Sequence, residues 1–277
     1  MVTPHSRFGL IGHPIARSLS PGLFRAAYDG KYPYELIQGE DFEASYHKFL
    51  EEYDGINVTA PFKELAYAKA DIRSEECSLA KAANLLVKIP EGVKAYNSDL
   101  LGVRLWLQEC TDGVDTTKNC NQQMTALIVG TGGAGRAAAA AAVTLGLKVI
   151  LMNRNIERAE RLAEDLRDMG YEAEVRTMDD FRECFRESDI IIYNIPTRIP
   201  GLDTLTDSDF ATGKPKFTLE ANYKDPSFDE NLIKRMTQAN PLARHSGGRT
   251  WLLYQALTGY EIFTGERPDL QRMSDVL

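Results

Sequence analysis

The stretch TALIVGTGGAGRAAAAAAVTLGLKVILMNRNIER, from Thr125 to Arg158, decides the fold of this chain. It opens with a short apolar strand, Ala126–Val129, and continues through a glycine-rich turn at 130–135. An alanine-rich helix follows, and then a second apolar strand, Lys148–Met152. In such a βαβ unit the glycines make a tight turn, admit a pyrophosphate to the backbone and let the helix pack on the strand. The stretch therefore predicts a dinucleotide-binding unit.

The turn itself supplies the expected contacts to the dinucleotide. Its pyrophosphate would meet the free N–H groups and the positive end of the helix that follows the turn. The residues expected to bind it there are Gly130, Gly132, Gly133, Ala134 and Gly135.

The end of the second strand indicates which dinucleotide binds. An NAD site usually carries an acid about 20 residues past the glycines to hold the ribose 2′-hydroxyl, yet no Asp or Glu occurs between Arg136 and Ile156. The strand exits instead into Asn153 and Arg154, with Arg158 one helical turn later. Each guanidinium would stabilise a 2′-phosphate by about 1.5–3 kcal/mol. The alternative is that both arginines are ordinary surface charges. The pattern favours NADP.

Composition narrows the class of protein. The chain has 277 residues, 43% of them hydrophobic, and a formal net charge of -8. This length allows two domains, and the acidic balance argues against nucleic-acid binding, which requires a basic patch. We expect no metal site and reduced thiols, because the four histidines are dispersed and no CxxC occurs among the cysteines Cys77, Cys110, Cys120 and Cys184.

Targeting signals are also missing. The N-terminal apolar run is too short for a signal peptide, and no apolar stretch is long enough to span a membrane. We therefore expect a cytoplasmic monomer or homodimer that binds a small-molecule substrate, without nucleic-acid or membrane partners.

Strand and helix patterns alternate in both halves of the chain. In the first half the expected elements are Phe8–Gly12, Tyr34–Gln38 and Ile56–Thr59 as strands, Leu85–Ile89 and Val93–Tyr96 as a hairpin, and Pro21–Asp29, Phe42–Tyr53 and Glu64–Ala70 as helices. In the second half they are Glu172–Arg176, Asp189–Tyr193 and Lys216–Glu220 as strands, and Glu157–Met169, Asp179–Glu187 and Trp251–Phe263 as helices. Cys110–Met124 is expected to be a connecting loop. This order predicts two α/β domains with mostly parallel sheets and a site in the cleft between them.

Polar groups at strand ends of the first half suggest chemistry. Ser18 and Ser20 flank a predicted helix start, where hydroxyl and N–H groups could hold a carboxylate; alternatively Ser20 only caps the helix, with Pro21 at its first position. An oxidoreductase acting on an alcohol needs a proton acceptor, and Lys63 and Asp99 are the candidates. Taken singly, either one could be an ordinary solvated side chain.

Together these segments resemble a known family. GLIGHPIARSLSP, GINVTAPFK, AAN, YNSD, GTGGAGRA with NRN, and YQALTGYEIFTG are similar to the motifs of shikimate dehydrogenases, in that family's order and over nearly the whole chain. The resemblance implies NADP-linked, reversible reduction of 3-dehydroshikimate to shikimate in the shikimate pathway of aromatic amino-acid biosynthesis. It also implies a substrate domain over 1–105, completed by C-terminal helices at 250–277, and a Rossmann-like NADP domain over 106–249.

The resemblance also assigns roles within the substrate site. It implies that the carboxylate and ring hydroxyls of a shikimate-like acid are bound by Ser18, Ser20, Thr59, Asn84, Tyr223 and Gln255. Lys63 and Asp99 would form the catalytic pair, and we favour Lys63 as the group that exchanges the proton with the reacting oxygen while Asp99 orients it. An ionised Asp99 would also hold the proton on the ammonium, so the sequence alone does not decide which residue carries it.

Several positions depart from the family pattern and bear on the substrate. They are Arg17, Phe24-Arg25, Leu85, Ser98, Leu100-Leu101, Glu220 and Thr250-Trp251. We expect Arg17 either to add a cation beside Ser18 and Ser20 or to pair with an acid elsewhere. The alternatives are a quinate or aminoshikimate dehydrogenase, in one version NAD-linked, and a catalytically silent NADP- or metabolite-binding regulator with the same fold.

Overall fold

The structure, a computed structural model, describes residues 3, 5–112 and 123–277 of the chain. It divides into one unit that reaches Gly102 and includes Leu253–Leu277, and a second unit that covers Val103–Leu252. The boundaries fall inside two helices, α5 (Ser98–Asp112) and α12 (Gly248–Thr264). The C-terminal helices therefore complete the N-terminal unit.

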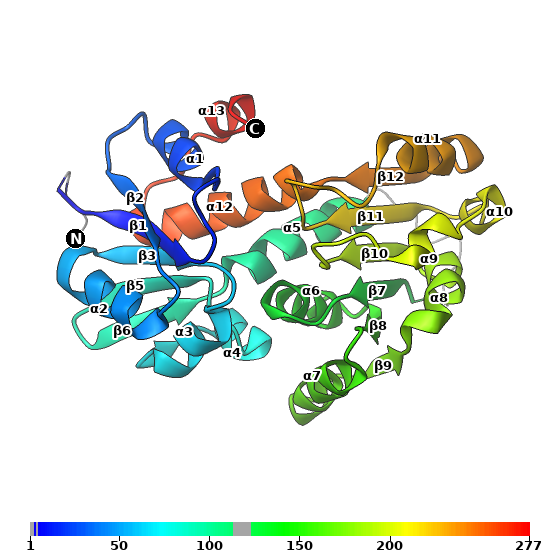
Figure 1. Ribbon diagram of the computed structural model, residues 1–277, viewed down its shortest axis with the longest axis horizontal. Helices are drawn as coiled ribbons and strands as arrows, with labels where there is room; N and C mark the ends of the chain where they lie inside the picture. The colour runs from blue at the N-terminus through cyan, green and yellow to red at the C-terminus, as the bar shows by residue number, and fades with distance from the viewer. Residues whose placement is uncertain (1–2, 4, 113–122) are drawn as a thin grey trace. The chain divides into compact units, whose positions relative to one another are not determined.

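The second unit is built on a sheet of six parallel strands. These are β7 (Thr125–Val129), β8 (Lys148–Met152), β9 (Ala173–Arg176), β10 (Ile190–Tyr193), β11 (Lys216–Glu220) and β12 (Ala243–Ser246). Their order is β12-β11-β10-β7-β8-β9, which can be followed in Figure 1. Numbered from β7, this is the 3-2-1-4-5-6 order of the Rossmann fold. The predicted fold class is confirmed.

The chain winds outward from β7 in both directions, and this sets the helix layers. The helices are α6 (Gly133–Thr144), α7 (Ile156–Asp168), α8 (Phe181–Glu187), α9 (Pro200–Asp203), α10 (Asp207–Phe210) and α11 (Glu230–Ala239). Right-handed crossovers place α6 and α7 on one face and the later helices on the other. The core on that second face joins Leu127 and Val129 of β7 to Phe181, Phe210 and Leu232. The order reverses between β7 and β10, where such sheets bind ligands.

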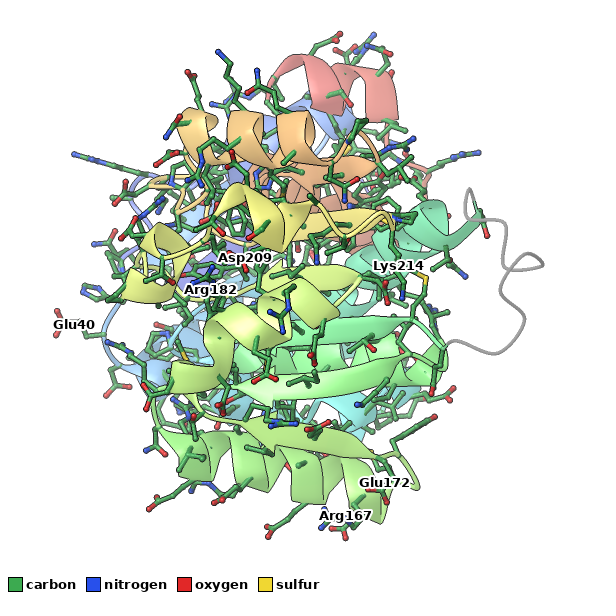
Figure 2. The ribbon with its side chains drawn as sticks, turned by 90° about the vertical axis from the view of Figure 1, so that its right-hand side faces the viewer. Glu40, Arg167, Glu172, Arg182, Asp209 and Lys214 are labelled. Atoms are coloured by element: carbon green, nitrogen blue, oxygen red, sulfur yellow. The ribbon has the colours of Figure 1, made fainter. Side chains whose placement is uncertain are left out.

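An ion pair anchors the helices of the second face to one another. Arg182 of α8 contacts both carboxylate oxygens of Asp209 in α10, at 3.1 and 3.0 Å, and Figure 2 shows the two side chains pointing toward one another. Asp209 is 2% exposed and also accepts hydrogen bonds from Thr206, so its charge is fully used in closing this turn.

The first unit contains a mixed sheet. Its strands are β1 (Phe8–Gly12), β2 (Tyr34–Gln38), β3 (Gly55–Val58), β4 (Ile72–Arg73), β5 (Leu85–Ile89) and β6 (Gly92–Tyr96), in the order β2-β1-β3-β5-β6-β4. The neighbours β2, β1 and β3 are parallel, whereas β5 and β6 form the predicted antiparallel hairpin. The carboxyl ends of β1 and β3 therefore lie at the same edge of the sheet as the start of β5 and the end of β6.

Two apolar clusters cover this sheet. Its remaining helices are α1 (Ser20–Ala27), α2 (Phe42–Glu52), α3 (Lys63–Lys69), α4 (Glu75–Ala80) and α13 (Leu270–Asp275). One cluster packs the side chains of α2 and α3 against β1 and β3. The other is aromatic: Phe8 stacks on Phe263 at 5.0 Å, and Phe24 meets Tyr260 edge-on at 4.8 Å. Since Tyr260 and Phe263 belong to α12, the C-terminal helix supplies part of this core.

The predicted start of the first helix is wrong. Leu19 is the N-cap residue, Ser20 is already helical, and no side chain caps this end. The serine hydroxyls are used elsewhere, because Ser18 Oγ accepts from the Ser20 N–H at 3.3 Å and donates to Ser20 Oγ at 3.1 Å. The helix tolerates the missing cap since Pro21 has no N–H to satisfy.

The first residues of the predicted connecting loop are helical. Cys110–Asp112 belongs to α5, and the rest of the expected loop up to 122, with Cys120, lies outside the described residues. The predicted helix Asp179–Glu187 divides into a 3-10 turn, Met178–Asp180, and α8. Five strands have the predicted bounds: β1, β2, β5, β8 and β11. The remaining predicted elements differ at their ends by one to three residues. The elements that were not predicted are α4, α5, α9, α10, α11, α13, β4 and β12.

The described residues contain neither a membrane-spanning helix nor a cluster of metal-binding side chains. None of their helices is long and apolar enough to cross a membrane. No group of three or more His, Cys, Asp or Glu side chains within residues 3, 5–112 and 123–277 is arranged to hold a metal ion.

Candidate active site

A buried lysine–aspartate pair lies at the sheet edge of the first unit. Lys63 Nζ donates to Asp99 Oδ2 at 2.6 Å, and the two side chains are 16% and 6% exposed. Lys63 is the first residue of α3, and Asp99 lies in the first turn of α5. A charged hydrogen bond this short and this shielded holds both groups in one geometry. The structure thus brings together the two residues that the sequence proposed as proton carriers.

Local chain geometry sets this pair in place. β3 ends at Val58, and the chain turns through a cis Ala60–Pro61 bond before α3 begins at Lys63. Thr59 lies in this turn. Its N–H donates to the Ile11 carbonyl of β1, and its own carbonyl accepts from the Phe62 N–H. The Lys63 carbonyl accepts from the Ala83 N–H at 2.9 Å. The lysine backbone is therefore tied to the segment that precedes β5.

An amide and hydroxyl cluster adjoins the pair. Asn84, which is 3% exposed, accepts from the Ser98 N–H through Oδ1 at 2.7 Å and donates through Nδ2 to Ser98 Oγ at 3.0 Å. Asn84 Nδ2 also reaches Gln255 Oε1 of α12 at 3.4 Å. The buried Ser98 hydroxyl thus contacts both Asn84 and Gln255. Since Ser98 immediately precedes Asp99, the cluster adjoins the lysine–aspartate pair.

The serine pair follows the neighbouring strand. Ser18 and Ser20 come after β1 and are joined by the hydrogen bond described above, and Tyr260 of α12 donates to the Ser20 carbonyl at 3.2 Å. All the predicted substrate residues except Tyr223 thus lie in the first unit, at the edge where β1 and β3 end. Sequence reasoning missed Asn57, whose side chain donates to the Asn84 carbonyl at 3.3 Å; a polar residue inside a buried apolar strand was the available signal.

The glycine turn of the second unit connects β7 to α6, and two of its positions require glycine. Gly130 has a φ of +93°, which disfavours any residue with a side chain. A Cβ on Gly135 would lie 1.9 Å from the Gly130 carbonyl oxygen, so only glycine lets the helix approach the strand this closely. Gly132, the N-cap of α6, is different: a Cβ there would meet nothing within 4 Å.

The residues of the turn fit a dinucleotide pyrophosphate. The open space at Gly132 adjoins the first N–H groups of α6, which have no intrahelical partners. Thr131 is 3% exposed and its hydroxyl has no hydrogen-bond partner in the described residues. This unsatisfied hydroxyl beside the glycine turn is a hydrogen-bond donor that the sequence did not single out. Gly133, Ala134 and Gly135 form the first turn of α6.

The end of β8 carries the groups expected at the ribose. Arg154 and Arg158 are both exposed at the start of α7. Asn155, the N-cap of this helix, accepts from the Arg158 N–H, and Asn153 Nδ2 donates to the Asn155 carbonyl at 3.2 Å. Arg154 makes no ion pair within the described part of the chain. Arg154 therefore immediately precedes the N-cap of α7, and Arg158 lies in the first turn of that helix.

Glu220 holds the loop that carries Tyr223. Glu220 ends β11, is fully buried, and accepts from the backbone N–H groups of Ser227 at 2.6 Å and Phe228 at 3.2 Å. Burial raises the pKa of this carboxyl. Tyr223 lies partly exposed between these residues in the second unit. The glutamate, which departs from the family pattern, therefore closes a loop and does not face solvent.

His245 makes the stability of this region depend on pH. It lies on β12 with Nδ1 2.8 Å from Thr218 Oγ1, and its ring stacks on Phe228 at 5.1 Å. Burial lowers the pKa of His245 to about 4, against about 6.5 in an unfolded chain. The unfolded chain therefore binds more protons between these values, and stability falls as pH decreases from 6.5 toward 4.

We expect His245→Asn to flatten that dependence. The imidazole alone contributes up to about 3 kcal/mol across the window from pH 4 to 6.5, because each pKa unit is worth about 1.4 kcal/mol. Urea midpoints measured at half-unit pH steps would show a shallower slope in the variant. The exposed His47 provides the control, since His47→Asn should retain the slope of the wild type. Equal slopes for both variants would contradict the assignment.

Several of the other departures from the family pattern lie in cores. Phe24, Leu85 and Leu100 are fully buried, and Trp251 is 7% exposed. Ser98 takes part in the Asn84 cluster. Arg17 is exposed and has no ion-pair partner among residues 3, 5–112 and 123–277. The expected alternative pairing with a distant acid is thus not found in the part of the chain that is described.

A Rossmann sheet with its glycine turn and an α/β unit with a buried lysine–aspartate pair define the class of two-domain nucleotide-dependent oxidoreductases. Residues 10–86 match the family described as shikimate dehydrogenase substrate binding domain, and residues 114–204 match shikimate / quinate 5-dehydrogenase. A shikimate dehydrogenase (NADP(+)) of Acinetobacter baumannii is 31% identical over 272 residues, 96% of this chain and 98% of the relative. The chain therefore belongs to the shikimate dehydrogenase family.

Solved structures agree with this family. A shikimate dehydrogenase crystallised with NADP+ superposes with a TM-score of 0.79 at 25% identity, covering 100% of this chain and 96% of the other. A quinate dehydrogenase of Corynebacterium glutamicum in complex with NAD superposes with a TM-score of 0.80 at 22% identity, covering 98% of each chain. At that identity the second likeness shows the fold alone.

Proposed function

We propose that this protein is an NADP-dependent shikimate dehydrogenase that interconverts 3-dehydroshikimate and shikimate in aromatic amino-acid biosynthesis. Its family membership and the NADP(+) enzymes among its relatives support this function. The observation that carries the proposal is the 2.6 Å contact between Lys63 and Asp99, shielded from solvent at the strand ends. It is the arrangement that removal of a hydroxyl proton requires.

The chemistry divides between cofactor and protein. When bound, NADP+ supplies the acceptor for the hydride that leaves the alcohol carbon. As the neutral amine, Lys63 takes the hydroxyl proton as the C–O bond becomes a carbonyl, and the ammonium so formed returns the proton in the reverse reaction. Asp99 accepts a hydrogen bond from Nζ and so directs the amine; its short contact also stabilises the ammonium that forms.

The remaining site residues bind and orient the substrate. Ser18 and Ser20 are proposed to hold the carboxylate through hydroxyl and N–H donors at the start of α1. The ring hydroxyls are assigned to Thr59, Asn84, Tyr223 and Gln255. We assign the pyrophosphate to Gly130, Gly132, Gly133, Ala134 and Gly135, and the 2′-phosphate to Asn153, Arg154 and Arg158. A soluble, cytoplasmic monomer or homodimer fits this role.

A substrate panel tests the proposal directly. Shikimate, quinate and aminoshikimate are each offered with NADP+ and with NAD+, and reduction is followed by nicotinamide absorbance. The proposed function requires shikimate with NADP+ to give the highest kcat/KM. The family match that names quinate as well as shikimate favours one second candidate, a quinate dehydrogenase, and higher kcat/KM for quinate would select it. No turnover despite tight NADP+ binding would indicate a silent regulator.

Arg17→Ala should raise the KM for shikimate about threefold to tenfold and leave kcat unchanged. Arg17 is an exposed cation next to Ser18, and an exposed charge contributes modestly because water screens it. The difference in KM from the wild type should shrink as salt is added. Lys48→Ala is the control, because Lys48 is an exposed cation on α2 of the same unit. An unchanged KM for Arg17→Ala would remove this residue from the carboxylate site.

A further inference from the structure

Tyr34 of β2 begins a hydrogen-bonded line within the first unit. Its hydroxyl donates to Asn57 Oδ1 at 2.7 Å, and the Ser20 side chain lies near it. Asn57 Nδ2 continues the line to the Asn84 carbonyl at 3.3 Å. Tyr34 lies in an ordinary strand pattern, so the sequence offers no reason to single it out. In the structure it is linked through Asn57 to Asn84 and lies near Ser20, and these two residues are assigned to opposite ends of a bound acid.

The direction of the hydrogen bonds follows from the groups themselves. A phenol has one proton, and Asn57 Oδ1 can only accept, so the Tyr34 proton points toward Asn57. Asn57 then donates through Nδ2 to the Asn84 carbonyl, so donation runs in one direction from Tyr34 to Asn84, and bonds aligned in this way strengthen one another.

The aromatic side chains packed on Tyr34 hold its hydroxyl in position. Its ring packs on Phe24 at 4.7 Å and on Tyr260 at 6.1 Å, which fixes the hydroxyl between Ser20 and Asn57. Burial raises the pKa of Tyr34 well above its usual range, so the donor keeps its proton throughout the neutral and mildly alkaline range. Asn57 is only 7% exposed. If the hydroxyl were removed, Asn57 Oδ1 would lose its partner and the amide would have to turn to find another.

We propose that Tyr34 is a positioning residue for the substrate site, holding the Asn57–Asn84 pair in place beside Ser20. The inference rests on the proposed function of Ser20 and Asn84 as substrate ligands. Tyr34 acts through these neighbours. Its hydroxyl fixes Asn57 and so the hydroxyl-binding side of the site, whereas the proton carriers Lys63 and Asp99 are held by their own contact.

Tyr34→Phe keeps the ring packing and removes only the hydroxyl. We expect the KM for shikimate to rise about tenfold, while kcat and the KM for NADP+ stay within twofold. The control is Tyr53→Phe, because Tyr53 donates to Glu35 at 2.6 Å in the same unit and does not contact the Asn57–Asn84 pair. A KM within twofold of the wild type would overturn the proposal. A fall in kcat together with a lower melting temperature would also overturn it, because general destabilisation would explain both.

A second measurement separates this inference from the proposed function. The side-chain amide signals of Asn57 and Asn84 in a ¹⁵N-resolved NMR spectrum should move in Tyr34→Phe and stay in place in Tyr53→Phe. Unmoved signals would overturn the positioning role whatever the substrate is. If the amide signals move but the protein does not turn over shikimate, the positioning role of Tyr34 is supported. Only the assignment of the substrate is then contradicted.

Discussion

Lys63→Ala should lower kcat by about 10²–10⁴-fold, the usual contribution of a positioned acid–base group. The side chain is 16% exposed and contacts Asp99 at 2.6 Å, so the substitution removes a positioned and largely shielded amino group. Steady-state rates in both directions, with saturating NADP+ or NADPH, measure the effect. A decrease of less than tenfold would contradict the role of Lys63 as the proton carrier.

Removal of the ammonium also takes the Lys63 contact away from the nearly buried Asp99, which destabilises the first unit. Lys63→Met is therefore measured alongside, because it retains most of the side-chain volume. Thermal unfolding and NADP+ affinity report whether each variant is folded. Lys69→Ala is the matched control: Lys69 lies on the same helix in an exposed pair with Glu43 and should change kcat by less than twofold.

A comparison with Asp99→Asn decides which residue carries the proton. The amide oxygen still accepts a hydrogen bond from Lys63, but the negative charge is lost. If Lys63 exchanges the proton and Asp99 only directs it, Asp99→Asn should reduce kcat less than Lys63→Ala does. A larger loss in Asp99→Asn than in Lys63→Ala would transfer the acid–base role to the carboxylate.

Replacing both Arg154 and Arg158 with alanine should raise the KM for NADP+ about 10²-fold and the KM for NAD+ less than threefold. Two charged hydrogen bonds could contribute 10²–10⁴-fold at about 1.5–3 kcal/mol each, and the exposure of both side chains places the expectation at the lower end. The ratio of the two KM values is the quantity to measure, because it cancels any change in how the rest of the dinucleotide binds.

The control for this variant comes from the same helix. Arg161 and Arg167 are also exposed arginines of α7, further from the end of β8. Their double replacement by alanine changes the net charge equally, so general electrostatic attraction of the phosphates is matched. We expect the ratio of KM values to stay at its wild-type value in this control. Equal increases in both KM values for Arg154→Ala/Arg158→Ala would contradict the 2′-phosphate assignment.

The nucleotide-binding unit could be predicted well because its information is local. β8 has the predicted bounds, and β7 begins one residue before the predicted strand. A buried parallel strand appears as an unbroken apolar run, and the glycine positions are fixed by backbone geometry alone. The elements that escaped prediction have weaker signals: α5 is interrupted by Gly102 and polar residues, and β12 contains Arg244 and His245.

The serine pair shows why the site itself was harder to predict. Ser20 before Pro21 has the pattern of a helix cap, yet Leu19 is the N-cap residue and the Ser20 hydroxyl accepts from Ser18 Oγ. A preference for caps does not tell which neighbouring group such a hydroxyl contacts. Glu220 is similar, because its carboxylate serves the N–H groups of a loop seven and eight residues later.

By itself the sequence determined the order of the elements, the glycine turn at 130–135, and the choice of Lys63 and Asp99 as candidates. These features follow from periodicity, backbone conformation and motif, which are properties of neighbouring residues. Only the tertiary structure decided that Lys63 lies 2.6 Å from Asp99, and that Asn84 meets Ser98 and Gln255. Those partners are separated by 14 to 171 residues, so packing alone brings their side chains within reach of one another.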